Sequence, residues 1–132
     1  MAEHPNATRC REIFEIIEHG TMDQVRAILA HEVVWQVPGR GKFAGPKNGI
    51  DEVFAFFEKV GWETRSATFH IELRDVVADD RHMIAVVHYH HTKGDKVFDQ
   101  DGLEIMTLDT AGRINKFSAF IRDSHAFDEF FS

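Results

Sequence analysis

Cysteine is almost absent from the 132-residue sequence, in which Cys10 is the only one. An intrachain disulfide is therefore impossible, and a reducing cytoplasm is the expected setting. No apolar run approaches the roughly 18–20 residues of a membrane-spanning helix. The first five residues lack the basic and apolar regions of a signal peptide. These absences predict a cytoplasmic protein that does not enter a membrane.

Clustered positive charge is also lacking. The chain has 15 Lys and Arg against 22 Asp and Glu, a net charge of −7 with histidine neutral. Nucleic-acid binders usually carry a basic stripe for phosphates, and the densest basic stretch here is only Arg40, Lys42 and Lys47. The three glycines of the loop 39–46 do not form a strand-to-helix phosphate-binding fingerprint. We therefore expect neither nucleic acid nor an anionic membrane surface as a partner.

Apolar residues, by contrast, are plentiful. They make up 43% of the chain and include 12 Phe, which excludes a disordered protein. A chain of this length forms one domain, here 1–132, whose core needs neither a metal nor a disulfide.

The first half of the sequence shows helical spacing of apolar residues. It predicts helices over about 6–19, over a second stretch that begins at Met22, and over about 49–60, with a short strand at 33–37. Gly20 is expected to end the first helix in the left-handed conformation. Thr21 and Gln24 predict a capping box for the second helix, and Asn48 is the predicted cap of the third.

The second half alternates apolar and polar residues as strands do. Four strands are predicted, at 66–77, 82–93, 96–108 and 113–123, followed by a short helix at 124–131. A two-residue turn at Gly94-Asp95 would place His88 opposite Asp101. Helices followed by an antiparallel meander predict an α+β fold with helices on one face of one sheet.

Several short segments carry a resemblance that covers nearly the whole chain. They are residues 20–23 (GTMD), 31–39 (HEVVWQVPG), 49–53 (GIDEV) leading into Phe56-Phe57, 111–114 (AGRI) and 128–131 (DEFF). The sequence resembles the nuclear transport factor two-like (NTF2-like) superfamily, and within it the SnoaL-like polyketide cyclases. The resemblance implies a cone-shaped α+β barrel, in which three N-terminal helices pack on a curved, mostly antiparallel sheet around an apolar cavity. It also implies a homodimer formed through the outer face of the sheet.

Known members of this superfamily catalyse isomerisation, cyclisation, dehydration or epoxide opening, and others only bind. Relative to ketosteroid isomerase, Val37 and Ile13 replace the base and the tyrosine, whereas Glu104 matches the protonated carboxyl donor. Relative to limonene epoxide hydrolase, only Asp123 and Gln36 match catalytic positions. The resemblance therefore disfavours steroid isomerisation by its usual mechanism, and the set of residues that matches the epoxide hydrolase is incomplete.

The polar candidates for catalysis are Asp123, Glu104, His88 and His90. Asp123 is either a helix cap or a general acid/base, and Glu104 is a proton donor if its strand face lines the cavity. His88 and His90 share one strand face, and they are predicted either as metal-free pocket histidines that bind a ligand or act as acid/base, or as structural or surface histidines. A metal site on these two histidines with Glu104 is a third alternative, and it would need a bulge between the strands.

The remaining site residues are aromatic or amide side chains. Trp35 and Gln36 are expected to position a substrate, and the cavity wall and core are assigned to Phe14, Phe54, Phe57, Phe69 and Phe117. The first hypothesis is a small cofactor-independent enzyme that uses general acid/base chemistry on a small hydrophobic, carbonyl-bearing or cyclic molecule. The alternative is a non-catalytic module that binds a hydrophobic ligand or dimerises as an accessory subunit.

Overall fold

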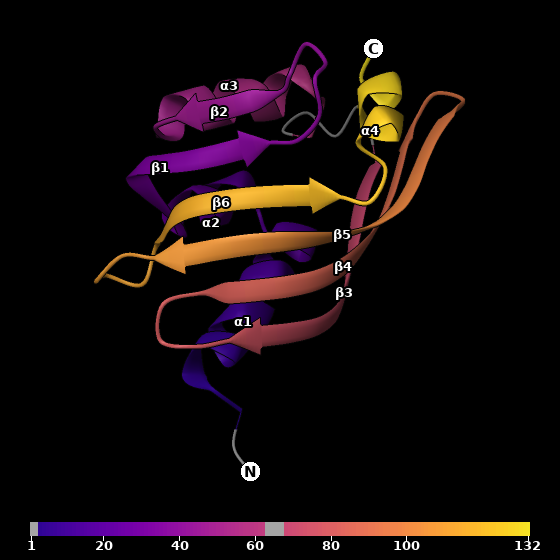
Figure 1. Cartoon of the computed structure of the whole chain (residues 1–132). Coiled ribbons are helices and arrows are strands. Elements are labelled where there is room, and N and C mark those ends of the chain that lie inside the picture. The colour runs from indigo at the N-terminus through magenta and orange to yellow at the C-terminus, as the bar shows by residue number, and fades with distance from the viewer. Residues whose placement is uncertain (1–2, 63–67) are drawn as a thin grey trace.

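The computed structural model describes residues 3–62 and 68–132 (Figure 1). Within these ranges the elements are, in chain order, α1 (Pro5–His19), α2 (Met22–Ala27), β1 (Leu29–Val37), β2 (Gly45–Asn48), α3 (Ile50–Lys59), β3 (Thr68–Ala78), β4 (Met83–Lys93), β5 (Lys96–Leu108), β6 (Ile114–Ile121) and α4 (Ser124–Phe130). Of the predicted strand 66–77, residues 66 and 67 lie outside the described ranges. None of the helices described is long and apolar enough to cross a membrane.

The six strands form one curved sheet that does not close into a barrel, in the order β2-β1-β6-β5-β4-β3. Only β1 and β6 pair in parallel, and the other neighbours are antiparallel. Figure 1 views the sheet from its outer face, with α1 and α2 behind it. The expected α+β cone, with helices packed on the inner face of a mostly antiparallel sheet, is confirmed.

Two of the three predicted helix ends differ from expectation. The capping box is present, because Thr21 and Gln24 bond each other reciprocally. Gly20, however, is extended, with φ −82°, and glycine fits there because a Cβ would lie 2.6 Å from the Ile16 carbonyl oxygen. Asn48 is not the cap of α3; its N–H donates to Glu52 Oε1 at 3.0 Å, and the cap position is Gly49, at φ +85°.

The strand β2 was not predicted. It is four residues long, contains Pro46 and lies at the edge of the sheet, where a missing N–H is tolerated. Such a short segment with glycine and proline has no alternating pattern to reveal it.

The pairing of β4 with β5 is as predicted from the Gly94-Asp95 turn. Lys93 lies opposite Lys96 and His88 lies opposite Asp101, and the register runs without a bulge to Met83 and Met106. Tyr89 and His91 consequently point to the same face of the sheet as Glu104, and His88 and His90 point to the other. This register decides which polar groups are enclosed.

Candidate functional site

A cavity of about 110 Å³ lies between the inner face of the sheet and the helices α1, α3 and α4. Its wall is almost entirely apolar and aromatic. The titratable side chains among its lining residues are Tyr89, His91 and Glu104. Two of these, His91 and Glu104, are the only buried polar or charged residues in the described ranges.

Glu104 is the buried acid of the cavity, with 3% of its surface exposed. Its Oε2 accepts a hydrogen bond of 2.8 Å from the Tyr89 hydroxyl, whereas its Oε1 has no partner among the described residues. Burial raises the pKa of Glu104 from 4.5 to about 7, and the Tyr89 hydrogen bond opposes this rise. Near neutral pH a large fraction of Glu104 is therefore protonated and can donate a hydrogen bond.

Tyr89 reaches Glu104 because residue 102 is a glycine. A Cβ at Gly102 would lie 2.5 Å from Cε2 of the Tyr89 ring and 2.7 Å from the Phe120 carbonyl oxygen. Burial and the neighbouring Glu104 carboxylate raise the pKa of Tyr89 well above 10, so its hydroxyl remains a donor. Gly102 thus makes room for the ring that supports Glu104.

His91 is the second polar group of the cavity, with 6% of its surface exposed. Its ring stacks on Phe98, with centroids 5.6 Å apart, and meets Phe69 edge-on at 4.7 Å. Its Nδ1 has no hydrogen-bond partner within the described part of the chain. Burial lowers the pKa of His91 to about 4, so the imidazole is neutral at physiological pH.

Aromatic rings form much of the remaining wall. Trp35 stacks on Phe117 at a centroid distance of 3.7 Å and meets Phe57 edge-on at 5.1 Å. Phe127 of α4 and Phe131, which directly follows this helix, complete the wall. Such a wall favours a flat, apolar ligand.

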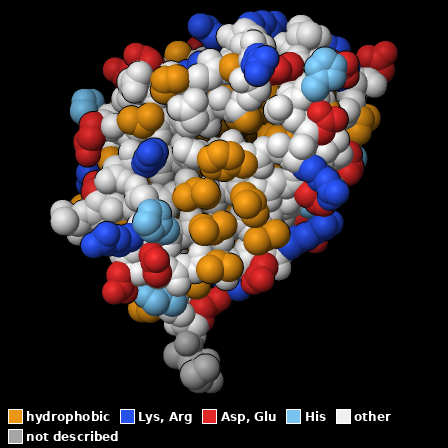
Figure 2. All heavy atoms as spheres, in the orientation of Figure 1, with side chains coloured by type: hydrophobic (Ala, Val, Ile, Leu, Met, Phe, Trp, Pro, Cys, Tyr) orange, Lys and Arg blue, Asp and Glu red, His pale blue; other side chains and the backbone are white. Residues whose placement is uncertain are grey.

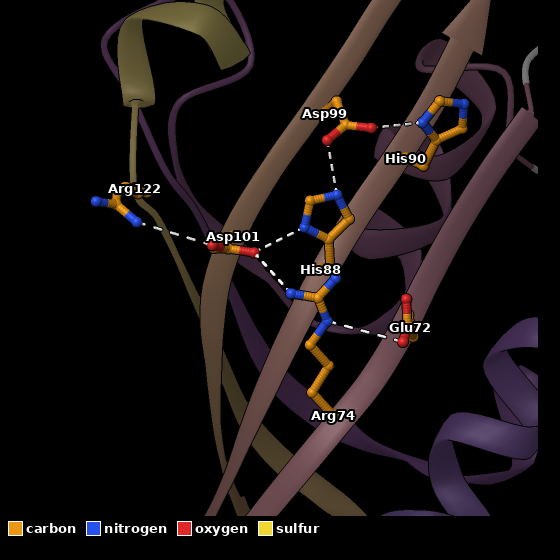
Figure 3. Close-up of polar contacts among 7 residues, drawn as sticks. All are labelled: Glu72, Arg74, His88, His90, Asp99, Asp101 and Arg122. Atoms are coloured by element: carbon orange, nitrogen blue, oxygen red, sulfur yellow. Dashed lines mark hydrogen bonds and ion pairs between the residues drawn. The ribbon is translucent and has the colours of Figure 1, made fainter.

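His88 and His90 lie on the outer face of the sheet, contrary to the expectation that they are pocket histidines. His88 binds Asp101 through Nδ1 and Asp99 through Nε2, both at 2.7 Å, and His90 Nδ1 lies 2.8 Å from Asp99 (Figure 3). Arg74 extends this network, since it contacts Asp101 and Glu72. The hydrogen bond with Asp101 raises the pKa of His88. The buried residues of β4 are the odd-numbered ones, which face the helices, so the even-numbered His88 and His90 point outward.

The metal alternative required Glu104 on the face of His88 and His90, and the register puts it on the opposite face. Both ring nitrogens of His88 are engaged with aspartates. Among residues 3–62 and 68–132, no group of three or more His, Cys, Asp or Glu is arranged to hold a metal ion.

Of the other predicted site residues, some line the cavity and some lie in the core or at the surface. Trp35, Phe57, Phe69 and Phe117 line the cavity. Phe14 and Phe54 are buried in the core but do not line it, and Gln36 lines a separate surface groove beside Gly45 and Phe120.

Asp123 is exposed and caps α4, where its carboxylate accepts from the backbone N–H groups of His125 and Ala126 at 3.1 and 3.2 Å. It does not line the cavity. The structure thus places Asp123 as the helix cap that was one of its two predicted roles.

Tyr89 and His91 were not among the predicted site residues. The signal that could have found them is the hairpin register. Because Gly94-Asp95 sets Glu104 opposite Ala85, the residues of β4 that share its face are the odd-numbered ones, including Tyr89 and His91.

Comparison with known sequences agrees with this architecture. The profile of the SnoaL-like domain family matches residues 10–117, so the chain belongs to that family. It is also similar to an uncharacterized protein of Mycobacterium tuberculosis, Rv0034, with 27% identity over the full length of both chains.

Solved structures show the same fold. Bal32a, from a soil-derived mobile gene cassette, is 26% identical, with a TM-score of 0.85 and coverage of 96% of both chains. An NTF2-like protein from Burkholderia xenovorans has a TM-score of 0.79 at 18% identity and covers 100% of this chain and 99% of its own. The NTF2-like resemblance is thereby confirmed, and the fold and family support a ligand-binding or small-molecule-processing domain.

Proposed function

We propose that the cavity binds a small, flat, apolar carbonyl compound and that Glu104 donates a proton to its carbonyl oxygen. The observation that carries this proposal is the buried, unpartnered Oε1 of Glu104 in an otherwise apolar cavity. A buried polar atom without a partner is costly, because burial removes its water and nothing replaces it. A ligand with one hydrogen-bond acceptor would satisfy Glu104 when it is protonated.

The reaction class that fits is proton transfer next to a carbonyl group, as in isomerisation, cyclisation or dehydration. Glu104 would share its proton with the carbonyl oxygen as charge develops there, and the neutral His91 would accept the proton that leaves the adjacent carbon. The enol would then return to a carbonyl product as both protons move back. No cofactor takes part in this scheme.

The test is hydrogen–deuterium exchange at carbon. A panel of small cyclic ketones is incubated in deuterated buffer, and deuterium incorporation next to the carbonyl is followed by NMR. We expect exchange with wild type, and a loss of about 10²–10⁴-fold in Glu104→Gln, the range typical of a general acid or base. His88→Gln, on the outer face, is the matched control and should exchange at the wild-type rate.

A non-catalytic binding module is the second candidate, and the low pKa of His91 favours it, because a group with a pKa of about 4 is a weak base. Binding is measured independently through the fluorescence of Trp35 and Trp62, which both line the cavity. Saturable quenching by a ketone, with exchange equal to background in wild type and Glu104→Gln alike, would favour binding over catalysis.

We propose also that two copies associate through the outer face of the sheet. Val86, Leu103 and Phe120 are directly opposite one another across β4, β5 and β6, and Leu103 and Phe120 are 40% and 53% exposed. Figure 2 shows apolar side chains gathered over the middle of this face. Continuous exposed apolar surface of this kind marks protein contacts.

Sedimentation velocity measures this association. Wild type should sediment as a dimer and Phe120→Asp as a monomer. Val97→Asp, which places the same charge at an exposed β5 position outside the row, should remain dimeric. A monomeric wild type would contradict the proposal.

A further inference from the structure

Lysines that are far apart in the sequence meet in one pocket. The chain has six lysines, and four of them, Lys42, Lys59, Lys93 and Lys96, line a pocket of about 260 Å³. They come from the loop before β2, the last turn of α3, the end of β4 and the start of β5. Figure 1 shows the β4–β5 hairpin rising beside α4, which contributes Phe130 to the same pocket.

The charge of these lysines is largely uncompensated. Lys42, Lys59 and Lys93 form no ion pair among the described residues, and Asp95 is the only acidic side chain that lines the pocket. Lys96, in contrast, has a partner: its Nζ lies 3.4 Å from the main-chain oxygen and from the hydroxyl of Ser132, the last residue of the sequence. In a chain with a net charge of −7, this concentration of positive charge is local and opposite in sign to the whole.

Two of these positive charges lie next to each other because of the strand pairing in the sheet. Lys93 and Lys96 are directly opposite across β4 and β5, and like charges in that position destabilise a sheet. Elsewhere along the same two strands, His88 lies opposite Asp101 and His90 lies opposite Asp99, so a histidine there faces an acidic residue that can bind it. An anion bound between Lys93 and Lys96 would offset the repulsion between their two ammonium groups.

Local roles account for part of the cluster only. Lys59 is in the last turn of α3, where a cation interacts well with the helix dipole, and Lys42 lies over the Phe43 ring at 5.2 Å. Neither role applies to Lys93 or Lys96, and neither explains why all four lysines line the same pocket.

We propose that this pocket binds a phosphate group. Lysine ammonium groups are compact point charges that suit the several charges and oxygens of phosphate. The aromatic rings of Phe43, Phe130 and Phe131 add an apolar wall for whatever carries that group. Phe131 also lines the cavity of Glu104, so the phosphate site lies one side chain away from the cavity and is separate from it.

The test is a calorimetric titration with inorganic pyrophosphate at low ionic strength. The chain supplies a matched pair of variants with the same net charge: Lys93→Gln/Lys96→Gln removes two pocket lysines, and Lys47→Gln/Lys116→Gln removes the two lysines that lie outside. We expect saturable 1:1 binding to wild type and to the Lys47/Lys116 variant, and binding about tenfold weaker in the Lys93/Lys96 variant. Added salt should weaken the binding.

Absence of saturable binding to wild type, or equal weakening in both double variants, would overturn the proposal. Lys42→Gln/Lys59→Gln provides a second pocket variant if the first is poorly folded. Adenosine diphosphate separates the possible sources of the group: tighter binding than pyrophosphate points to an organic phosphate that contacts the aromatic wall, and equal binding points to the phosphates alone. Glu104→Gln should bind pyrophosphate like wild type, so this result is independent of the proposed catalytic role.

Discussion

Replacing Glu104 by glutamine should change how stability depends on pH. Burial raises the pKa of Glu104 from 4.5 to about 7 in the native state. At about 1.4 kcal/mol for each pKa unit, the whole difference corresponds to about 3–4 kcal/mol. In the unfolded chain Glu104 releases its proton near pH 4.5, whereas the native protein keeps it up to about pH 7. The contribution of Glu104 to the free energy of unfolding is therefore fully present below about pH 4.5 and is lost as the pH rises to about 7.

Urea unfolding of wild type and Glu104→Gln between pH 4.5 and pH 8 measures this loss. Glutamine keeps an acceptor for Tyr89 and does not titrate, so the contributions of all other groups cancel in the difference between the two proteins. The free energy of unfolding of wild type, relative to the variant, should fall by about 3 kcal/mol over this range.

Glu58→Gln is the matched control, since Glu58 is exposed on α3 and its substitution should leave the pH profile parallel to that of wild type. If the profiles of wild type and Glu104→Gln were also parallel, Glu104 would have an ordinary pKa. The reasoning from burial would then be refuted.

Other substitutions test the surroundings of the cavity. Tyr89→Phe removes the hydrogen bond to Glu104 Oε2, so it should lower the free energy of unfolding by about 1–3 kcal/mol and raise the pKa of Glu104 further, both visible in the same urea series. Gly102→Ala should displace the Tyr89 ring and alter the pH profile in the same direction, whereas Gly94→Ala, at a turn with open space, should leave that profile unchanged. Cys10 is buried and its pKa is raised to about 12, so an aromatic disulfide reagent at pH 8 should react with it only after denaturation; rapid reaction of the native protein would contradict this. Asp123→Ala should cost about 1 kcal/mol as a lost helix cap and leave ketone binding unchanged, as calorimetry and tryptophan fluorescence can show.

The sequence predicted the long elements well because their patterns are local. Apolar spacing identified α1 and α3 and the four long strands, and the Gly94-Asp95 turn determined the pairing of His88 with Asp101. The predictions for Gly20 and Asn48 were wrong because a contact formed only in the folded backbone decides the conformation there. The close approach of Gly20 to the Ile16 carbonyl and the Glu52 bond to Asn48 depend on the folded backbone.

The candidate site could be predicted only in part, because β4 carries aliphatic residues on both faces. Ile84 and Val86 on the outer face look as apolar as Ala85 and Val87 on the inner one, so alternation alone does not say which face meets the helices. The unusual pair His88 and His90 was predicted to face the pocket, whereas the structure places both on the outer face. Glu104, in contrast, was a candidate proton donor on the condition that its strand face lines the cavity, and the structure buries it there.

The lysine pocket illustrates a different limit. No stretch of the sequence is rich in lysine, and the four pocket lysines are up to 54 positions apart, from 42 to 96. Only the folding of the β4–β5 hairpin against α3 and the loop before β2 brings them together. Sequence charge patterns therefore exclude long basic stripes but not compact anion sites.

Titration of the Glu104 side-chain carboxyl by carbon-13 NMR is the most direct test of whether the cavity encloses an acid with a raised pKa. The Glu104 signal is assigned as the one that disappears in Glu104→Gln. A midpoint near pH 7, which shifts when a cyclic ketone is added, is the predicted result. A midpoint near 4.5 that no ligand moves would mean that Glu104 is in contact with water and cannot serve as the cavity's proton donor.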